Sequence, residues 1–103
     1  MERDNMIVIA VMYKVKLGKR EEALRAAKTC AETTRGEAGN IDDTFYAGVD
    51  SPDIFLLFEQ WESQKALDEH LKSEHLAAFR KVLGDLAAEP SKLRIFEASE
   101  IKK

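Results

Sequence analysis

The 103-residue sequence lacks several features that define whole classes of protein. It has one cysteine, Cys30, so no internal disulfide can form, and the N-terminus shows no export signal. We therefore expect a reducing, cytoplasmic compartment. No apolar run approaches the ~18 residues of a membrane span, which argues against a membrane partner. Lys and Arg number 16 against 19 Asp and Glu, so the chain lacks the basic stripe that nucleic acid requires.

The overall composition is that of a globular protein. Hydrophobic residues make up 45% and charged residues 34% of the chain, which excludes a disordered or fibrous protein. We find no linker, internal repeat or low-complexity tract. At this length we expect residues 1–103 to form a single domain with one core.

The hydrophobic pattern predicts four strands and two helical regions. Residues 6–15 are almost continuously apolar and rich in β-branched side chains, as in a strand buried on both faces. Residues 19–34 combine strong helix formers with a narrow stripe of small residues, namely Ala23, Ala27, Cys30 and Ala31. Further strands are predicted at 40–49, 54–62 and 93–101. Between the last two, Ser63 and Ser73 are the expected N-caps of two consecutive helices, and Pro90 stops the second.

The order β-α-β-β-α-β is the split βαβ, ferredoxin-like arrangement. We predict an α+β fold in which both helical regions cover one face of a four-stranded antiparallel sheet. The opposite face still carries apolar side chains from the first, third and fourth strands, and a bare apolar sheet face promotes aggregation. We therefore predict a homodimer in which two copies cover these faces against each other.

Four short motifs carry a resemblance to a known family. They are Arg35-Gly36-Glu37-Ala38-Gly39, Phe58-Glu59-Gln60-Trp61-Glu62-Ser63, Ala66-Leu67-Asp68-Glu69-His70-Leu71 and Ser73-Glu74-His75-Leu76-Ala77-Ala78-Phe79. In their order and spacing the chain, from Met6 to about Phe96, resembles the antibiotic biosynthesis monooxygenase domain, a group that includes quinol monooxygenases. The resemblance implies a dimeric α/β-barrel of ferredoxin-like subunits. It also implies oxygenation of phenolic polycycles or quinols without metal or flavin.

At several positions this chain carries a different residue from individual branches of the family, and these differences argue against the reactions of those branches. The haem-degrading branch needs an Asn, a Trp and a haem-ligating His, but Val11 and Arg80 stand at the Asn and His positions and only Trp61 matches. Haem degradation is therefore disfavoured. The polyketide-tailoring branch carries an Asn where this chain has Leu57, and many members carry a Tyr where Asp43 stands. A further branch isomerises a phosphorylated signalling sugar, so the fold alone does not settle the reaction.

Two histidines are candidate site residues. His75 precedes Phe79 by four residues, at the border of the last helix's core face, where a neutral imidazole could remove a proton from a phenol or quinol. The alternative is a helix-terminal histidine bonded to backbone or water. His70 either shares this pocket or covers the short helix. The two lie five residues apart across a helix break, with no cysteine or clustered carboxylate to complete a site, so we predict no metal.

Trp61 and Asp43 are the strand candidates. The indole of Trp61 could stack on a planar substrate and donate its N–H to an oxygen, or it could pack in the core. Asp43 shares its predicted strand face with Ile41 and Phe45. It therefore lies either at a wet edge or in a partly desolvated position, where its raised pKa would make it a usable base.

The remaining candidates have plainer explanations. Arg80 and Arg94 could pair a substrate phosphate or carboxylate, or they could be surface arginines. Tyr13 and Tyr46 are expected to pack, and Cys30 is expected to be a small buried hydrophobe.

Together with what the resemblance implies, these observations favour a cofactor-independent monooxygenase that oxidises a small aromatic or quinol with dioxygen, with His75 as base. Trp61, Asp43, His70 and Arg80 are the predicted substrate-binding residues. Two alternatives stay open at this point: a non-redox isomerase or lyase acting on a small metabolite, and a non-catalytic dimeric ligand-binding module.

Overall fold

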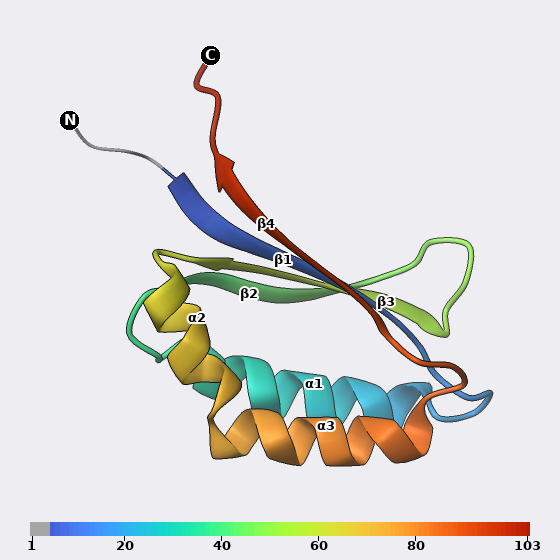
Figure 1. The fold of residues 1–103 in the computed structure, drawn as a ribbon. Helices are drawn as coiled ribbons and strands as arrows, with labels where there is room; N and C mark the ends of the chain where they lie inside the picture. Colours follow the sequence, from blue (N-terminus) through green and yellow to red (C-terminus); the bar gives the residue numbers. More distant parts are fainter. Residues whose placement is uncertain (1–4) are drawn as a thin grey trace.

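The computed structural model describes residues 5–103. Seven elements follow one another along the chain: β1 (Asn5–Lys14), α1 (Arg20–Thr34), β2 (Asn40–Ala47), β3 (Ile54–Trp61), α2 (Gln64–Leu71), α3 (Glu74–Leu86) and β4 (Lys92–Ser99). This is the predicted ferredoxin-like order, with the second helical region divided in two (Figure 1). Among the described residues, no helix has the length and apolar character needed to cross a membrane.

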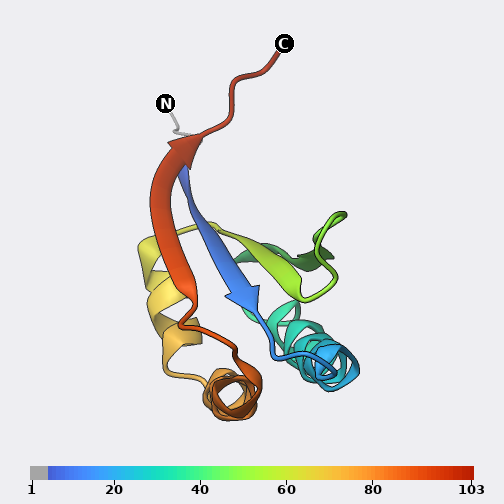
Figure 2. The same ribbon diagram turned by 90° about the vertical axis from the view of Figure 1, so that its right-hand side faces the viewer.

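The four strands form one antiparallel sheet in the order β2-β3-β1-β4. All three helices lie on the same face of this sheet, which the two perpendicular views show (Figures 1 and 2). α1 and α3 pack side by side beneath it, and α2 contacts β3. The predicted two-layer α+β arrangement is therefore confirmed.

Burial alternates along the central strands, because successive side chains point to opposite faces. In β3 the residues Phe55, Leu57, Glu59 and Trp61 are buried while their neighbours are partly exposed. The predicted small-residue stripe of α1 is buried as well. Small contact residues let this helix pack closely, and α1 accordingly lies against α3 and β2.

Both predicted N-caps are present. The Ser63 hydroxyl accepts a hydrogen bond from the Ala66 N–H at 3.1 Å, and the Ser73 hydroxyl accepts one from the Leu76 N–H at 3.3 Å. Each cap satisfies a backbone donor that the first helical turn leaves free. The caps place the break between α2 and α3 at Lys72 and Ser73.

The predicted face of β2 was wrong at Ile41. The pairing of β2 with β3 shifts register between Asn40 and Asp42, so Ile41 is an extra residue that is not opposite any residue of β3. It is 50% exposed and borders a surface hollow with Met6 and Gln60. A bulge inserts one residue and reverses the side-chain alternation beyond it, which is why Ile41 and Asp43 do not share a face.

Candidate functional site

A cluster of three polar side chains joins the loop after α1 to the helices α2 and α3, which only two residues separate. One carboxylate oxygen of Glu37, Oε1, lies 2.7 Å from His70 Nδ1 and 2.7 Å from His75 Nε2. His70 is 2% exposed, whereas Glu37 and His75 each keep about one-fifth of their side chain in solvent. The cluster therefore runs from the protein interior to the surface.

Local sequence explains why these three residues meet. Gly39 adopts a φ of +84°, and a side chain there would collide with Ala66 of α2. A glycine thus allows the loop that carries Glu37 to lie directly against α2. The two-residue break between the helices then brings the end of α2, with His70, and the start of α3, with His75, to the same carboxylate.

A second set of contacts extends the cluster into the sheet. The ring of His70 stacks on Trp61 with centroids 4.7 Å apart, and the Trp61 Nε1–H donates to Glu59 Oε1 at 2.8 Å. The same Glu59 oxygen lies 3.9 Å from His70 Nε2. Burial raises the pKa of Glu59, against the opposing effect of the indole hydrogen bond and of His70. Glu59 therefore keeps its proton to a higher pH than an exposed glutamate does.

Asp43 lies beside Glu59, to which it is paired across β2 and β3. It is 2% exposed, and its Oδ1 has no hydrogen-bond partner within residues 5–103. Burial, followed by the charge of Glu59, raises the pKa of Asp43 to about 7, while Arg35 opposes the change. Of the two predicted explanations, the desolvated position is confirmed and the wet edge was wrong.

Two other buried groups hold their protons firmly. Burial raises the pKa of the Tyr13 hydroxyl, and the charge of Glu59 adds to this effect. Burial also raises the pKa of the Cys30 thiol to about 11. Cys30 is thus the small buried hydrophobe that the sequence predicts, and it is no nucleophile at neutral pH.

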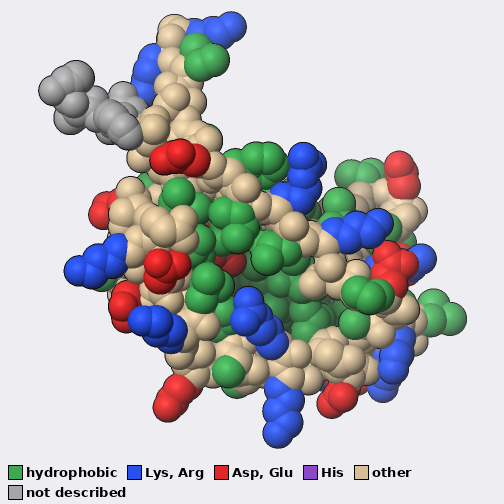
Figure 3. Space-filling view, in the orientation of Figure 1, with side chains coloured by type: hydrophobic (Ala, Val, Ile, Leu, Met, Phe, Trp, Pro, Cys, Tyr) green, Lys and Arg blue, Asp and Glu red, His purple; other side chains and the backbone are tan. Residues whose placement is uncertain are grey.

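A cavity of about 490 Å³ opens between α3 and β4. Its floor and walls include Val11 and Tyr13 from β1, Arg80 and Leu83 from α3, and Leu93 from β4. Hydrophobic side chains gather in a hollow between these elements (Figure 3). The volume falls within the roughly 300–1,000 Å³ of ligand pockets. Glu59 is opposite Ile9 in the β1–β3 register and hence diagonal to Val11 on the cavity floor.

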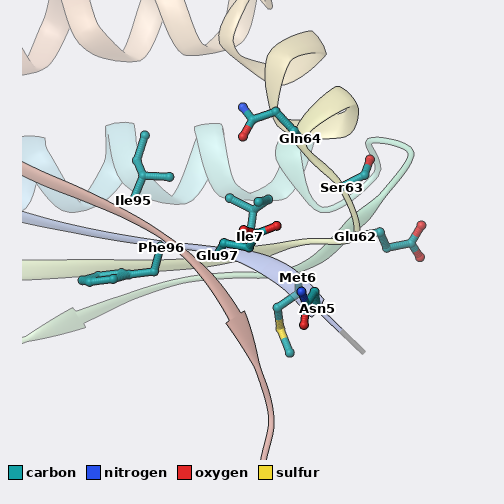
Figure 4. A pocket seen from close by; sticks show the side chains of 9 residues that line it. All are labelled: Asn5, Met6, Ile7, Glu62, Ser63, Gln64, Ile95, Phe96 and Glu97. Carbon is teal, nitrogen blue, oxygen red and sulfur yellow. The ribbon is translucent and has the colours of Figure 1, made fainter. Parts of the chain in front are cut away.

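A second hollow of about 340 Å³ lies at the other end of β4, where β4 and β1 face the start of α2. In Figure 4 the side chain of Ile95 points toward the helices, whereas Phe96 leaves the strand on the opposite side. Ile95 is 49% exposed although its β1 partner Ile9 is buried. The helix-facing side of β4 is therefore open along much of its length.

The structure brings together some of the predicted site residues and separates others. Trp61, His70 and His75 belong to one network, whereas Arg80 lines the cavity between α3 and β4. Trp61 is 0% exposed, and its N–H is already donated to Glu59. His75 borders a different hollow, of about 280 Å³, between α1 and α3.

Arg94 and the two tyrosines have clear positions too. Arg94 lies over the Phe96 ring at 5.0 Å, away from the cavity. Tyr46 is 50% exposed, and Tyr13 packs edge-on against Phe79 while lining the cavity.

Two carboxylates of the network, Glu37 and Glu59, are not among the residues predicted from the sequence. Glu37 and Glu59 both stand inside the family motifs, and Glu59 alternates with the apolar residues Phe55, Leu57 and Trp61 on a buried strand face. That alternation was the available signal for Glu59. The premise that no carboxylate joins the histidines was wrong, because Glu37 contacts both of them.

The comparisons with known proteins agree with this architecture. Residues 6–82 match the family model described as antibiotic biosynthesis monooxygenase. The chain is 30% identical over 95 residues to the Bacillus subtilis protein named "Putative monooxygenase YcnE", covering 92% of this chain and all of that protein. It is 35% identical over 97 residues to "Uncharacterized protein sll1783" of Synechocystis, spanning 94% of this chain but 66% of that protein's length.

Solved structures give the same result. The structure named "Putative antibiotic biosynthesis monooxygenase from Nitrosomonas europaea" superposes with a TM-score of 0.88 at 28% identity, covering 95% of this chain and 94% of that one. A Bacteroides thetaiotaomicron protein titled as a possible oxidoreductase gives a TM-score of 0.85 at 29% identity, covering 93% of this chain and 100% of that one. On the family model, the sequence relatives and the shared fold, this chain belongs to the antibiotic biosynthesis monooxygenase family.

Proposed function

We propose that this protein oxidises a small aromatic or quinol substrate with dioxygen, without a bound cofactor, in the cavity between α3 and β4. The apolar walls suit a planar hydrophobic ring, and the family membership supports a monooxygenase. Arg80 and the Tyr13 hydroxyl are the polar groups that would orient the oxygen atoms of such a substrate.

The observation that carries the proposal is a series of proton-carrying groups beside this cavity, which is joined by hydrogen bonds except for one gap of 3.9 Å. It begins at Glu59, next to the cavity floor, and passes to His70 across 3.9 Å. From His70 it continues through Glu37 to His75 with contacts of 2.7 Å each. His75, the predicted base, would act through this series as its solvent-exposed end.

The chemistry needs no external reductant. Removing a proton from a phenol or quinol raises the electron density of the ring, which can then transfer an electron to dioxygen. In an anthrone, one O₂ converts the ring CH₂ to a carbonyl and releases one water. In a quinol, one O₂ converts a ring C–H to C–OH, oxidises the ring to the quinone and likewise releases one water, so the substrate supplies all the electrons. The protein's tasks are to accept the proton and to exclude water, and a buried carboxylate with a raised pKa is suited to the first.

The test is oxygen uptake with a panel of naphthols, anthrones and quinols. We expect turnover of at least one of them, lowered at least tenfold in Glu59→Gln and in His75→Ala, since a general base contributes roughly 10²–10⁴-fold. Glu69→Gln is the matched control, because Glu69 is an exposed carboxylate next to His70. No turnover of any member of the panel, or equal turnover in all variants, would contradict the proposal.

A non-redox isomerase is the second candidate, and the position of Arg80 favours it. A guanidinium at the cavity wall could bind the phosphate or carboxylate of a small metabolite. This activity would proceed without oxygen and would be lost in Arg80→Ala. Binding of a phosphorylated sugar to the wild-type protein, with no oxygen uptake on any aromatic, would favour this reaction over the oxidation.

We further propose that the protein works as a homodimer joined through the sheet face opposite the helices. Met12, Tyr46 and Phe96 on that face are 43%, 50% and 39% exposed. Such apolar exposure on a sheet is typical of an interface. Sedimentation should give a dimer at micromolar concentration, and Phe96→Glu should shift it toward the monomer. A stable wild-type monomer would contradict this arrangement.

A further inference from the structure

We propose that Glu37, His70 and His75 form a binding site for a divalent transition-metal ion such as Zn²⁺. One ligand atom from each residue lies within 4.8 Å of the other two. The proposal goes beyond the oxidation described above and does not depend on it, because an ion bound here would occupy the groups that carry the proton in that scheme and the two uses of the cluster exclude each other. It rests on the donor set, on the access of the cluster to solvent and on the position of His70 between two carboxylates.

The donor set is the one that such ions prefer. Two imidazole nitrogens and a carboxylate oxygen bind zinc and its neighbours in the periodic table, and catalytic zinc sites commonly hold three protein ligands and one water. Because Glu37 and His75 are each about one-fifth exposed, an ion can enter from solvent and keep a water ligand.

The distances require small movements. Around a tetrahedral zinc ion with bonds of about 2.0–2.1 Å, neighbouring ligand atoms lie about 3.3 Å apart. Each 2.7 Å contact of Glu37 Oε1 must therefore widen by roughly 0.6 Å. The two ring nitrogens lie within 4.8 Å of each other, so they must approach by at most about 1.5 Å. Rotations of the Glu37 and His75 side chains, which are partly in solvent, can supply these movements.

His70 has carboxylates on both sides of its ring. Nδ1 faces Glu37 at 2.7 Å, and Nε2 faces Glu59 at 3.9 Å. A neutral imidazole carries one N–H. If that N–H points to Glu37, the lone pair of Nε2 points toward the oxygen of Glu59.

A metal ion on Nδ1 removes the repulsion between the Nε2 lone pair of His70 and the oxygen of Glu59. The single proton then resides on Nε2 and points to Glu59, whose oxygen is held in place by the Trp61 N–H at 2.8 Å. A metal-bound histidine whose other nitrogen donates to a carboxylate is a common arrangement in metalloproteins. An imidazolium at His70, or a proton on Glu59, would satisfy these groups too, and a metal titration separates these explanations from a bound ion.

The experiment uses the full chain after dialysis against a chelator. Calorimetric titration with Zn²⁺ should give one ion per chain, and Co²⁺ should produce the intense visible bands of a four-coordinate ion. The chain has two histidines, and both belong to the cluster. Glu37→Gln and His75→Ala should each weaken Zn²⁺ binding at least tenfold. The fully buried His70 is left unchanged, because its removal beside Trp61 could unfold the protein.

Two controls should bind Zn²⁺ as tightly as the wild type. Glu69→Gln removes an exposed carboxylate adjacent to His70, and Cys30→Ala removes the thiol as a competing ligand. Affinity in the wild type weaker than millimolar overturns the proposal, as does unchanged affinity in both Glu37→Gln and His75→Ala. Since binding is the readout, a lack of oxygen uptake leaves this result unaffected.

Discussion

The two ends of the interface between sheet and helices are stabilised in different ways. Beneath α1 and the later part of α3, the interface is apolar, and Tyr13, Phe45 and Phe79 pack with ring centroids 5.6–6.3 Å apart. Beneath α2, the buried groups include His70 and Glu59, whose hydrogen-bond partners are Glu37 and the Trp61 N–H, respectively. An apolar end tolerates small shifts, whereas a polar end holds a defined set of partners, since a buried polar group left unpaired is strongly unfavourable.

Because the apolar and the polar end of this interface are stabilised by different interactions, we predict that mutations at the two ends change the stability of the protein differently. Phe79→Ala at the apolar end should lower the free energy of unfolding by about 3–5 kcal/mol, because it leaves a cavity in the core. Urea denaturation measures this loss. Val82→Ala, on the same helix but 42% exposed, is the control and should change stability by about 0.5 kcal/mol or less. A change in the imidazole NMR signals of His70 in folded Phe79→Ala would show that the ends are coupled.

Asp43 lies between the apolar and the polar end of the interface, and its titration should make the free energy of unfolding depend on pH. The folded protein keeps the proton of Asp43 up to pH about 7, whereas the unfolded chain loses it near 3.8. The contribution of this group to the free energy of unfolding therefore falls as pH rises between these values, by at most about 4 kcal/mol at 1.36 kcal/mol per pH unit.

Asp43→Asn should flatten this dependence and make the protein more stable than the wild type at pH 8. Glu59, Arg35, Asp42 and Glu37 are the charged groups that act on Asp43, and all of them remain in the variant. Thermal unfolding from pH 4 to 8 measures the difference between the two proteins. An unchanged slope in Asp43→Asn would assign the pH dependence to another group.

Gly39 tests how closely the polar end must pack. Gly39→Ala should destabilise the protein by about 1–3 kcal/mol, because the new methyl group meets Ala66 and the backbone has a positive φ. It should also separate Glu37 from His70, which the imidazole NMR signals would report. Gly84→Ala is the control, since a methyl group there meets no atom of residues 5–103 within 4 Å, and it should be neutral or slightly stabilising. Equal effects of the two substitutions would argue against close packing at this point.

His75→Ala should have the smallest effect on stability. It removes one contact of Glu37 at the surface while the contact with His70 remains, so we expect a loss of about 0.5–1.5 kcal/mol. Urea denaturation at pH 7 measures it. A loss as large as that of Phe79→Ala would mean that the polar network, rather than the aromatic core, supports the fold.

The fold could be predicted from periodicity because most strands and helices follow one hydrophobic pattern. The β3 alternation and the serine caps before α2 and α3 are local signals, and the structure contains them where they were expected. The face of Ile41 could not be predicted in this way. A bulge depends on how β2 meets β3, and no local pattern in the chain marks it.

The candidate site was predicted in part. His75, His70 and Trp61 were recognisable as individual residues, but the connection of the two histidines through Glu37 was not, because 33 residues separate Glu37 from His70 along the chain. The burial of Asp43 was left open, since a strand residue's neighbours on the adjacent strand decide whether water reaches it.

By itself, then, the sequence determined the order of the elements, the caps that divide the second helical region and the apolar face that packs against the helices. These follow from interactions between residues close in the chain and from the alternation of side chains. The tertiary structure alone decided which charged groups share the interior, because the pKa of Asp43, the double contact of Glu37 and the opening between α3 and β4 all arise from segments far apart in sequence.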